Sequence, residues 1–208
     1  MNKYLVEFIG TFFLVLTIGM VVIEPGAGAL APLAIGSMLA VMVYAGGHIS
    51  GGHYNPAVTL AVWLRGKSTA GRALAYMAVQ IVASVVAAFI ALFMKGNPAV
   101  SGTTLDPAPA LIGEFLFTFA LAFVVLNVAT AKATEGNSYF GFAIGFTLVV
   151  AIYSLASVSG GAINPAVGIG ITVMGLSSLG NLWVYLLATF LGGAAAALAF
   201  RGLNPSDG

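Results

Sequence analysis

The sequence predicts an all-α membrane protein with six transmembrane helices and two re-entrant half-helices arranged as an inverted repeat. First, only 6% of the 208 residues are charged, against about a quarter in soluble domains. Second, long charge-free apolar segments recur along the chain, and several are long enough to cross a bilayer. Third, one short motif occurs twice, once in each half. Together these observations indicate that the membrane is the solvent for most of the surface.

Charge and composition exclude several classes of function. The formal net charge is +1 and no basic run occurs, so we expect no nucleic-acid partner. The chain has no cysteine and only two histidines, so no metal site and no cofactor are expected. Because no convincing nucleophile and base pair or phosphate loop is present, the sequence does not indicate an enzyme.

Six segments have the length of a membrane crossing, which requires about 20 apolar residues. They cover residues 4–23, 30–47, 73–94, 108–131, 139–156 and 182–200. The first segment, with Lys3 before it and small residues at 27–29, also resembles a secretory leader. Glu7 inside this segment favours a permanent span, because a second carboxylate, Glu114, occupies the matching place in the second half.

Two apolar tracts, 55–64 and 164–174, are too short to cross the bilayer. If they do not cross, six of the seven basic residues fall on the side of the termini, and only Lys95 falls on the other side. Basic residues collect on the cytoplasmic side of membrane proteins. We therefore predict a protein of the cell membrane with both termini in the cytoplasm.

The repeated motif sets the organisation of the chain. Residues 48–62 (HISGGHYNPAVTLAV) and 157–173 (SVSGGAINPAVGIGITV) share SGG, two intervening residues and NPAV. The spacing from Glu7 to Asn55 is nearly the same as the spacing from Glu114 to Asn164. Three crossings in each half give the two copies opposite orientations in the membrane. We predict one channel domain over residues 1–208, with inverted repeats at about 1–95 and 108–201.

Each short tract has the signals of a helix that starts inside the membrane. Pro56 and Pro165 follow Asn55 and Asn164, and Asn followed by Pro suits the cap and first turn of a helix. The irregular backbone before each tract cannot face lipid, but it can line a watery cavity. Two half-helices that meet near the bilayer centre present their positive dipole ends there and repel cations.

These features resemble the aquaporin, or major intrinsic protein, family. The two Asn-Pro-Ala motifs are Asn55, Pro56, Ala57 and Asn164, Pro165, Ala166. The resemblance covers almost the whole chain and implies a passive channel for water or small uncharged solutes, without a cofactor. It also implies a homotetramer with one pore in each subunit.

The resemblance carries over four filter positions near the outer mouth: Ile35, Ile152, Gly161 and Val167. Most relatives have arginine where this chain has Val167, and position 152 lacks histidine. An apolar ring of this kind predicts a wide filter for polyols, urea or neutral metalloid hydroxides. A hydrophobic gate that opens and closes by dewetting is the alternative.

The polar residues within the apolar segments have two interpretations. The first is bracing of the irregular loops, which we predict for Glu7, Glu114, Gln80, His48, Ser50 and Ser159. The second makes Glu7 and Glu114 proton carriers in an ion- or proton-coupled secondary transporter. His53 is expected near the cytoplasmic vestibule. A non-conducting structural pore is a further alternative, because the filter arginine is missing.

Overall fold

The computed structural model describes residues 1–207, and of Ser206 it describes the backbone alone. Over this range the chain forms eight α-helices and no β-strand. The helices are α1 (Asn2–Val22), α2 (Ala31–Ser50), α3 (Pro56–Leu64), α4 (Ala70–Met94), α5 (Pro107–Thr130), α6 (Phe140–Leu155), α7 (Pro165–Val173) and α8 (Leu182–Leu203). Short 3-10 helices cover Gly28–Leu30, Lys132–Thr134, Leu179–Asn181 and Pro205–Asp207.

The predicted fold class is confirmed. Among residues 1–207, five helices are long and apolar enough to cross a membrane, namely α1, α2, α4, α5 and α8. The sixth predicted crossing, α6, is apolar but has 16 residues, which corresponds to about 24 Å of helix. Helices α3 and α7 have nine residues each, or about 14 Å. Each therefore reaches only about halfway through a hydrocarbon core of roughly 30 Å.

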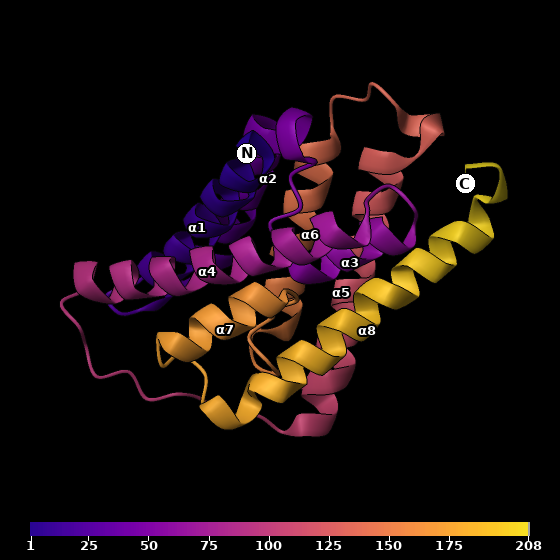
Figure 1. Cartoon of the computed structure of the whole chain (residues 1–208). Helices are drawn as coiled ribbons and strands as arrows, with labels where there is room; N and C mark the ends of the chain where they lie inside the picture. Colours follow the sequence, from indigo (N-terminus) through magenta and orange to yellow (C-terminus); the bar gives the residue numbers. More distant parts are fainter. Residues whose placement is uncertain (208) are drawn as a thin grey trace.

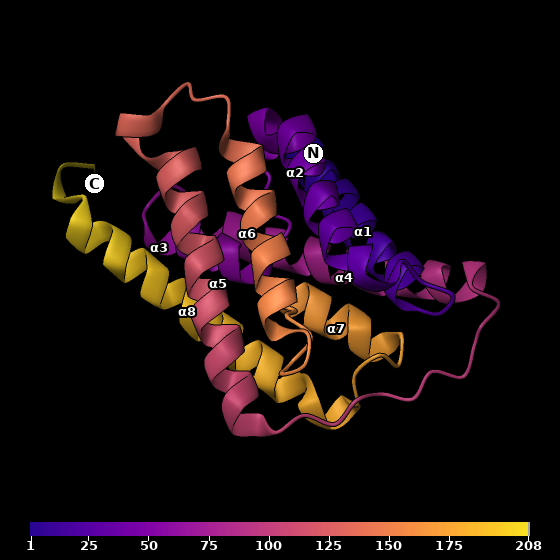
Figure 2. The same ribbon diagram turned by 180° about the vertical axis from the view of Figure 1, so that it is seen from behind.

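The two halves of the chain are interlocked. Within the first half α1 packs on α2 and α4, and within the second half α5 packs on α6 and α8. The halves meet along α2 and α6. Each half-helix also packs on a long helix of the other half, α3 on α8 and α7 on α4. Figure 1 shows α3 and α7 between α4 and α8, and Figure 2 shows α5 and α6 from behind.

The contact between half-helix and long helix is made differently in the two halves. Where α4 meets α7, the Ser84 hydroxyl donates a hydrogen bond of 2.5 Å to the Ala166 carbonyl. Where α8 meets α3, Gly193 lies so close that an added Cβ would be 2.5 Å from the Ala57 carbonyl oxygen. Ser84 and Gly193 occupy matching places, since each follows the motif asparagine of its own half at the same spacing.

Both termini lie at the end of the molecule away from the segment that joins α4 to α5 (Figure 1). At this end Arg65 and Asp207 form a buried ion pair with 2.9 Å between Nη2 and Oδ2. Arg65 also donates to the hydroxyl and carbonyl of Thr130, and Asp207 accepts from the Lys132 backbone N–H. These bonds attach the last described turn to the end of α3 and to the connection between α5 and α6.

Candidate functional site

The loops that lead into α3 and α7 have an unusual backbone. The glycine pairs at 51–52 and 160–161 all have positive φ, between 63° and 97°. Glycine adopts this region readily because it has no Cβ. Tyr54 (φ 48°) and Ile163 (φ 39°) adopt it too, and for a β-branched residue this conformation is rare. The surrounding contacts must therefore hold both loops firmly.

The first loop is held by the carboxylate of Glu7, which is 0% exposed. Its Oε1 accepts from the Ser50 hydroxyl at 2.6 Å and from the His53 backbone N–H at 3.0 Å. Its Oε2 accepts from the Tyr54 backbone N–H at 2.8 Å and from Gln80 Nε2 at 2.8 Å. Four donors thus converge on one buried carboxylate, which supplies a partner for backbone amides that lipid could not satisfy.

The second loop repeats this arrangement around Glu114, which is also 0% exposed. Its Oε1 accepts from the Ser159 hydroxyl at 2.6 Å and from the Ala162 backbone N–H at 2.9 Å. Its Oε2 accepts from the Ile163 backbone N–H at 2.6 Å. The geometry around both carboxylates is that of the predicted bracing role.

Two tyrosines add a bond to each loop that the sequence analysis did not anticipate. The Tyr76 hydroxyl donates to the Ser50 carbonyl and the Tyr185 hydroxyl donates to the Ser159 carbonyl, each at 2.9 Å. The two tyrosines follow the motif asparagines of their own halves at the same spacing. Comparing the halves position by position would have identified this pair.

His48 is the exception among the predicted bracing residues. Its side chain is exposed in the last turn of α2 and, among residues 1–207, makes no hydrogen bond. It lines the cavity at the end of the bundle that holds the termini. The structure therefore corrects the prediction for this residue, because α2 continues past His48 and keeps its side chain away from the loop.

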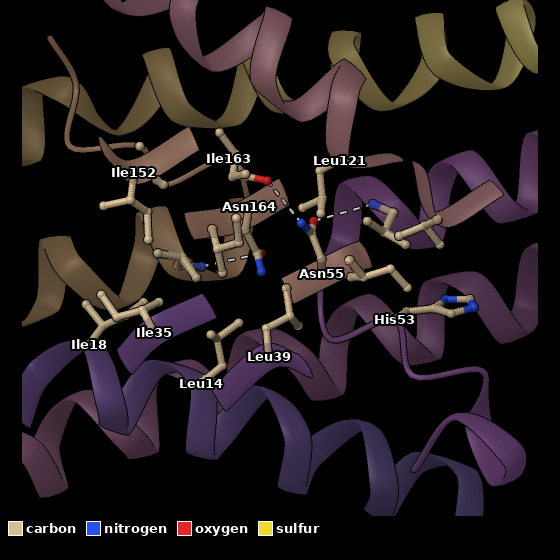
Figure 3. Close-up of a pocket in the computed structure, with 17 residues that line it drawn as sticks. Leu14, Ile18, Ile35, Leu39, His53, Asn55, Leu121, Ile152, Ile163 and Asn164 are labelled. Carbon is tan, nitrogen blue, oxygen red and sulfur yellow. Dashed lines mark hydrogen bonds between the residues drawn. The ribbon is translucent and has the colours of Figure 1, made fainter. Parts of the chain in front are cut away.

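The two motif asparagines face each other at the centre (Figure 3). The Asn55 side-chain oxygen accepts from the backbone N–H groups of Ala57 and Val58, and its Nδ2 donates to the Ile163 carbonyl at 3.0 Å. Asn164 caps α7 in the same way, and its Nδ2 donates to the Tyr54 carbonyl at 2.9 Å. A carboxamide nitrogen has two hydrogens. One N–H of each asparagine therefore remains for another acceptor.

Three cavities follow one another through the bundle. One vestibule of about 440 Å³ opens beside the segment 101–105, and a second of about 450 Å³ opens beside the segment 128–137. We call the first the outer vestibule because it lies away from the termini, and the second the inner vestibule because it lies at their end of the molecule. Between them lies a middle cavity of about 30 Å³, which has room for roughly two water molecules. Figure 3 shows the residues that line it. Among these, only His53, Asn55 and Asn164 have polar side chains in the described part of the chain.

The four predicted filter residues lie together. Ile35, Ile152, Gly161 and Val167 line both the middle cavity and the outer vestibule, so they mark the junction of the two. Ile18 of α1 lines both cavities too. Sequence reasoning missed Ile18, since the resemblance supplied only positions on α2, α6, α7 and the second loop.

His53 lies at the inner end of the middle cavity. Its Nδ1 is 3.1 Å from the Thr59 hydroxyl, and Thr59 donates its own hydrogen to the Asn55 carbonyl at 2.9 Å. Which of the two atoms, His53 Nδ1 or Thr59 Oγ1, donates in this contact depends on the tautomer of the imidazole. Residues 1–207 contain no group of three or more His, Cys, Asp or Glu side chains that could hold a metal ion.

Comparison with known proteins gives matches over nearly the whole chain. Residues 1–200 match the family described as major intrinsic protein. A glycerol uptake facilitator protein-like 6 from Lactiplantibacillus plantarum is 38% identical, with all of both chains covered. Aquaporin NIP1-4 from Oryza sativa is also 38% identical, over 96% of this chain and 76% of the relative. The X-ray structure of the aquaglyceroporin from Plasmodium falciparum matches with a TM-score of 0.80 at 17% identity, over 99% of this chain and 98% of that one.

Proposed function

Because the chain belongs to the major intrinsic protein family and is a passive channel for water and small solutes, we propose that its apolar outer junction selects uncharged solutes by size. The chain is a channel and not an enzyme. The observation that carries the proposal is that Ile35, Ile152 and Val167 lie where the middle cavity meets the outer vestibule.

The junction favours solutes that give up water at little cost. The side chains of Ile35, Ile152 and Val167 offer no charge and no hydrogen bond. A solute with hydroxyl or amide groups regains hydrogen bonds further in, where each motif asparagine has one free N–H. An ion would regain far less of its hydration energy. Glycerol, urea and neutral metalloid hydroxides are the proposed solutes, and the name of the bacterial relative supports glycerol.

Cations are disfavoured a second time at the centre of the channel. Asn55 and Asn164 cap the N-termini of α3 and α7, and both of these residues line the middle cavity. The N-terminus of a helix carries a partial positive charge of about half an elementary charge. Two such ends at one narrow point raise the energy of any cation there.

Coupled transport, the alternative function, would assign proton transfer to Glu7 and Glu114. Both carboxylates are fully buried and accept hydrogen bonds from the loops. Neither of them lines the middle cavity or either vestibule. This geometry supports a structural role, so we propose passive conduction without coupling.

Stopped-flow measurements on liposomes test the proposal. Vesicles that contain the purified protein are mixed rapidly with a hyperosmotic solution of one solute: sucrose, glycerol, urea or a neutral metalloid acid. We expect glycerol and urea to enter at rates well above those of empty vesicles and without saturation at high solute concentration. Water should also flow, and no cation current should be carried. Uptake that requires a proton gradient would favour the coupled transporter. No flux of any solute or of water would favour a non-conducting structural pore.

We further propose a homotetramer in the cell membrane with cytoplasmic termini. Large apolar side chains such as Phe93 and Leu198 are exposed on the outside of the bundle, as contact with lipid or with another subunit requires. Arg65 and Lys132 lie at the end that holds the termini, whereas Lys95 donates to the Pro25 carbonyl at the other end.

Single cysteines at Asn97 and Glu135 test this orientation in intact cells. We expect an impermeant thiol reagent to label position 97 and not position 135. Labelling of position 135 from outside would reverse the orientation. Cross-linking in native membranes tests the tetramer, which should give bands up to four subunits.

A further inference from the structure

The lining of the middle cavity repeats itself between the two halves of the chain. Ile35 and Ile144 precede the motif asparagines of their own halves at the same spacing, and Val58 and Val167 follow those asparagines at the same spacing. All four line the middle cavity. These four lining residues therefore form two matched pairs, and each pair consists of a single residue type.

Because the halves are inverted, the mate of an outer residue lies toward the inner side. The outer junction contains Ile35, Ile152 and Val167, and the residues at the matching spacings from the other asparagine are Ile144, Val43 and Val58, in that order. Ile144 and Val58 line the middle cavity, and Val43 lines the inner vestibule. Each outer residue lines both of the cavities that it adjoins, whereas each mate lines only one of the two inner spaces, so these spaces are separate on this side.

Buried apolar residues also separate the middle cavity from the inner vestibule. The middle cavity shares six lining residues with the outer vestibule but, over the range the structure describes, none with the inner vestibule. Ile144, Val43 and Val58 are 4%, 2% and 2% exposed. A solute that has crossed the outer junction therefore meets a second apolar layer before it reaches the inner vestibule.

We propose that Val43, Val58 and Ile144 form a second selectivity barrier, in series with the outer junction and matched to it. This inference rests on the proposed function, because it describes how the same neutral solutes cross the inner half of the pore. Val58 and Val167 are the same residue at matched positions. With valine rather than a cation at position 167, neither end dominates selection.

Two matched barriers in series have a specific kinetic consequence. When two equal resistances are joined, removing one raises the total permeability by at most about twofold, because the other then limits flow. Removing both raises it much further. Narrowing either one is enough to stop a glycerol-sized solute. A single substitution should therefore change the permeability by a similar amount at either end. The double variant should change the permeability by more than the two single effects combined.

The test uses Val58→Ala, Val167→Ala and the double variant in liposomes matched for protein content. Glycerol and water permeability are measured for each. We expect each single variant to raise glycerol permeability by no more than about twofold and the double variant to exceed the product of the two. Val62→Ala is the matched control, because Val62 lies on the same half-helix as Val58, is buried in the core and lines none of the three cavities.

A second pair of variants covers the case in which the alanine proteins fail to fold. Val58→Phe and Val167→Phe narrow the two ends, and we expect both to reduce glycerol permeability at least tenfold. If Val58→Ala has no effect in either background, or Val58→Phe still passes glycerol, the inner barrier does not exist. Failure of the proposed function would look different, since the unaltered protein would then pass no glycerol while all variants folded.

Discussion

The two re-entrant loops share one framework and differ in what surrounds it. In each, a buried glutamate accepts hydrogen bonds from a serine hydroxyl and from two successive backbone amides, and a tyrosine hydroxyl donates to the serine carbonyl. These bonds satisfy backbone groups that would otherwise be orphaned inside the membrane. Both loops need hydrogen-bond partners for buried backbone amides, and in both halves a buried glutamate supplies them.

The surroundings differ in where the additional polar side chains lie: beside the first loop they contact the carboxylate and the histidine, whereas beside the second loop Ser177 contacts the bracing hydroxyl of Tyr185. Gln80 donates to both Glu7 and Thr59, and the Thr59 hydroxyl shares a hydrogen bond of 3.1 Å with His53 Nδ1. At the position that matches Gln80, the second half has Thr189, which bonds its own helix. The position that matches His53 is Ala162. The comparison teaches that loop shape is set by backbone satisfaction, whereas polarity along the pore is set by residues that the framework does not require.

Replacing either carboxylate is expected to have the largest effect. Glu7→Gln and Glu114→Gln each place a carboxamide NH₂ against a backbone N–H, so one buried donor loses its partner at a cost of about 1–3 kcal/mol. We expect thermal unfolding in detergent at lower temperature and lower expression for both variants, with no new pH dependence of solute flux. A well-folded Glu114→Gln protein that loses only gradient-driven accumulation would contradict the shared structural role.

The contacts of the half-helices offer a sharper contrast. Gly193→Ala puts a methyl group against the Ala57 carbonyl, and overpacking of this kind costs about 1–3 kcal/mol. Ser84→Ala removes one hydrogen bond to Ala166, which is worth about 1 kcal/mol. We expect Gly193→Ala to destabilise the protein more than Ser84→Ala does, as measured by denaturation in detergent. Equal effects would mean that the close approach at Gly193 relaxes freely.

A charge at Val167 makes the outer junction of the pore differ from the inner layer around Val58. Val167→Arg narrows the outer junction and supplies hydrogen-bond donors for water. We expect it to reduce glycerol permeability about tenfold, equivalent to roughly 1.4 kcal/mol in barrier height, and to reduce water permeability much less. Proton current under voltage clamp should also fall, because a fixed charge in a narrow apolar site repels cations. An unchanged ratio of glycerol to water flux in a folded variant would mean that position 167 does not line the filter.

The smallest expected effect concerns His53. His53→Ala gives the inner end the residue that the outer end already has, removes the bond to Thr59 at a cost of about 1 kcal/mol, and widens the inner layer. Glycerol permeability should rise by no more than about twofold, because the outer junction then limits flow. A fall in permeability would show instead that the imidazole of His53 assists passage of hydroxyl groups.

Much of the fold can be predicted from sequence, because the signals are local. The predicted bounds of the six long segments and two half-helices agree with the observed ends to within a turn of helix, since apolar length and the Asn-Pro caps determine them. The framework around Glu7 and Glu114 is also accessible, because a buried carboxylate next to an irregular loop has few other partners.

The remaining features depend on how helices rotate about their axes in three dimensions. Ile18 and Val43 look like ordinary apolar residues of a span, and nothing in their local sequence marks them as lining the cavities. His48 looks equivalent to His53 in the sequence, yet the last turn of α2 leaves it exposed. The ion pair of Arg65 with Asp207 joins residues 142 positions apart, and neither residue has a sequence signal that points to the other.

This ion pair bears on how the protein is made. Arg65 is synthesised early, but its carboxylate partner is added 142 residues later. Until then the guanidinium must remain hydrated or bind another group, because a buried unpaired charge costs about 3–5 kcal/mol. The inner end of α3 therefore cannot reach its final packing during insertion of the first half. Completion of the bundle is therefore a late event that follows translation of residue 207.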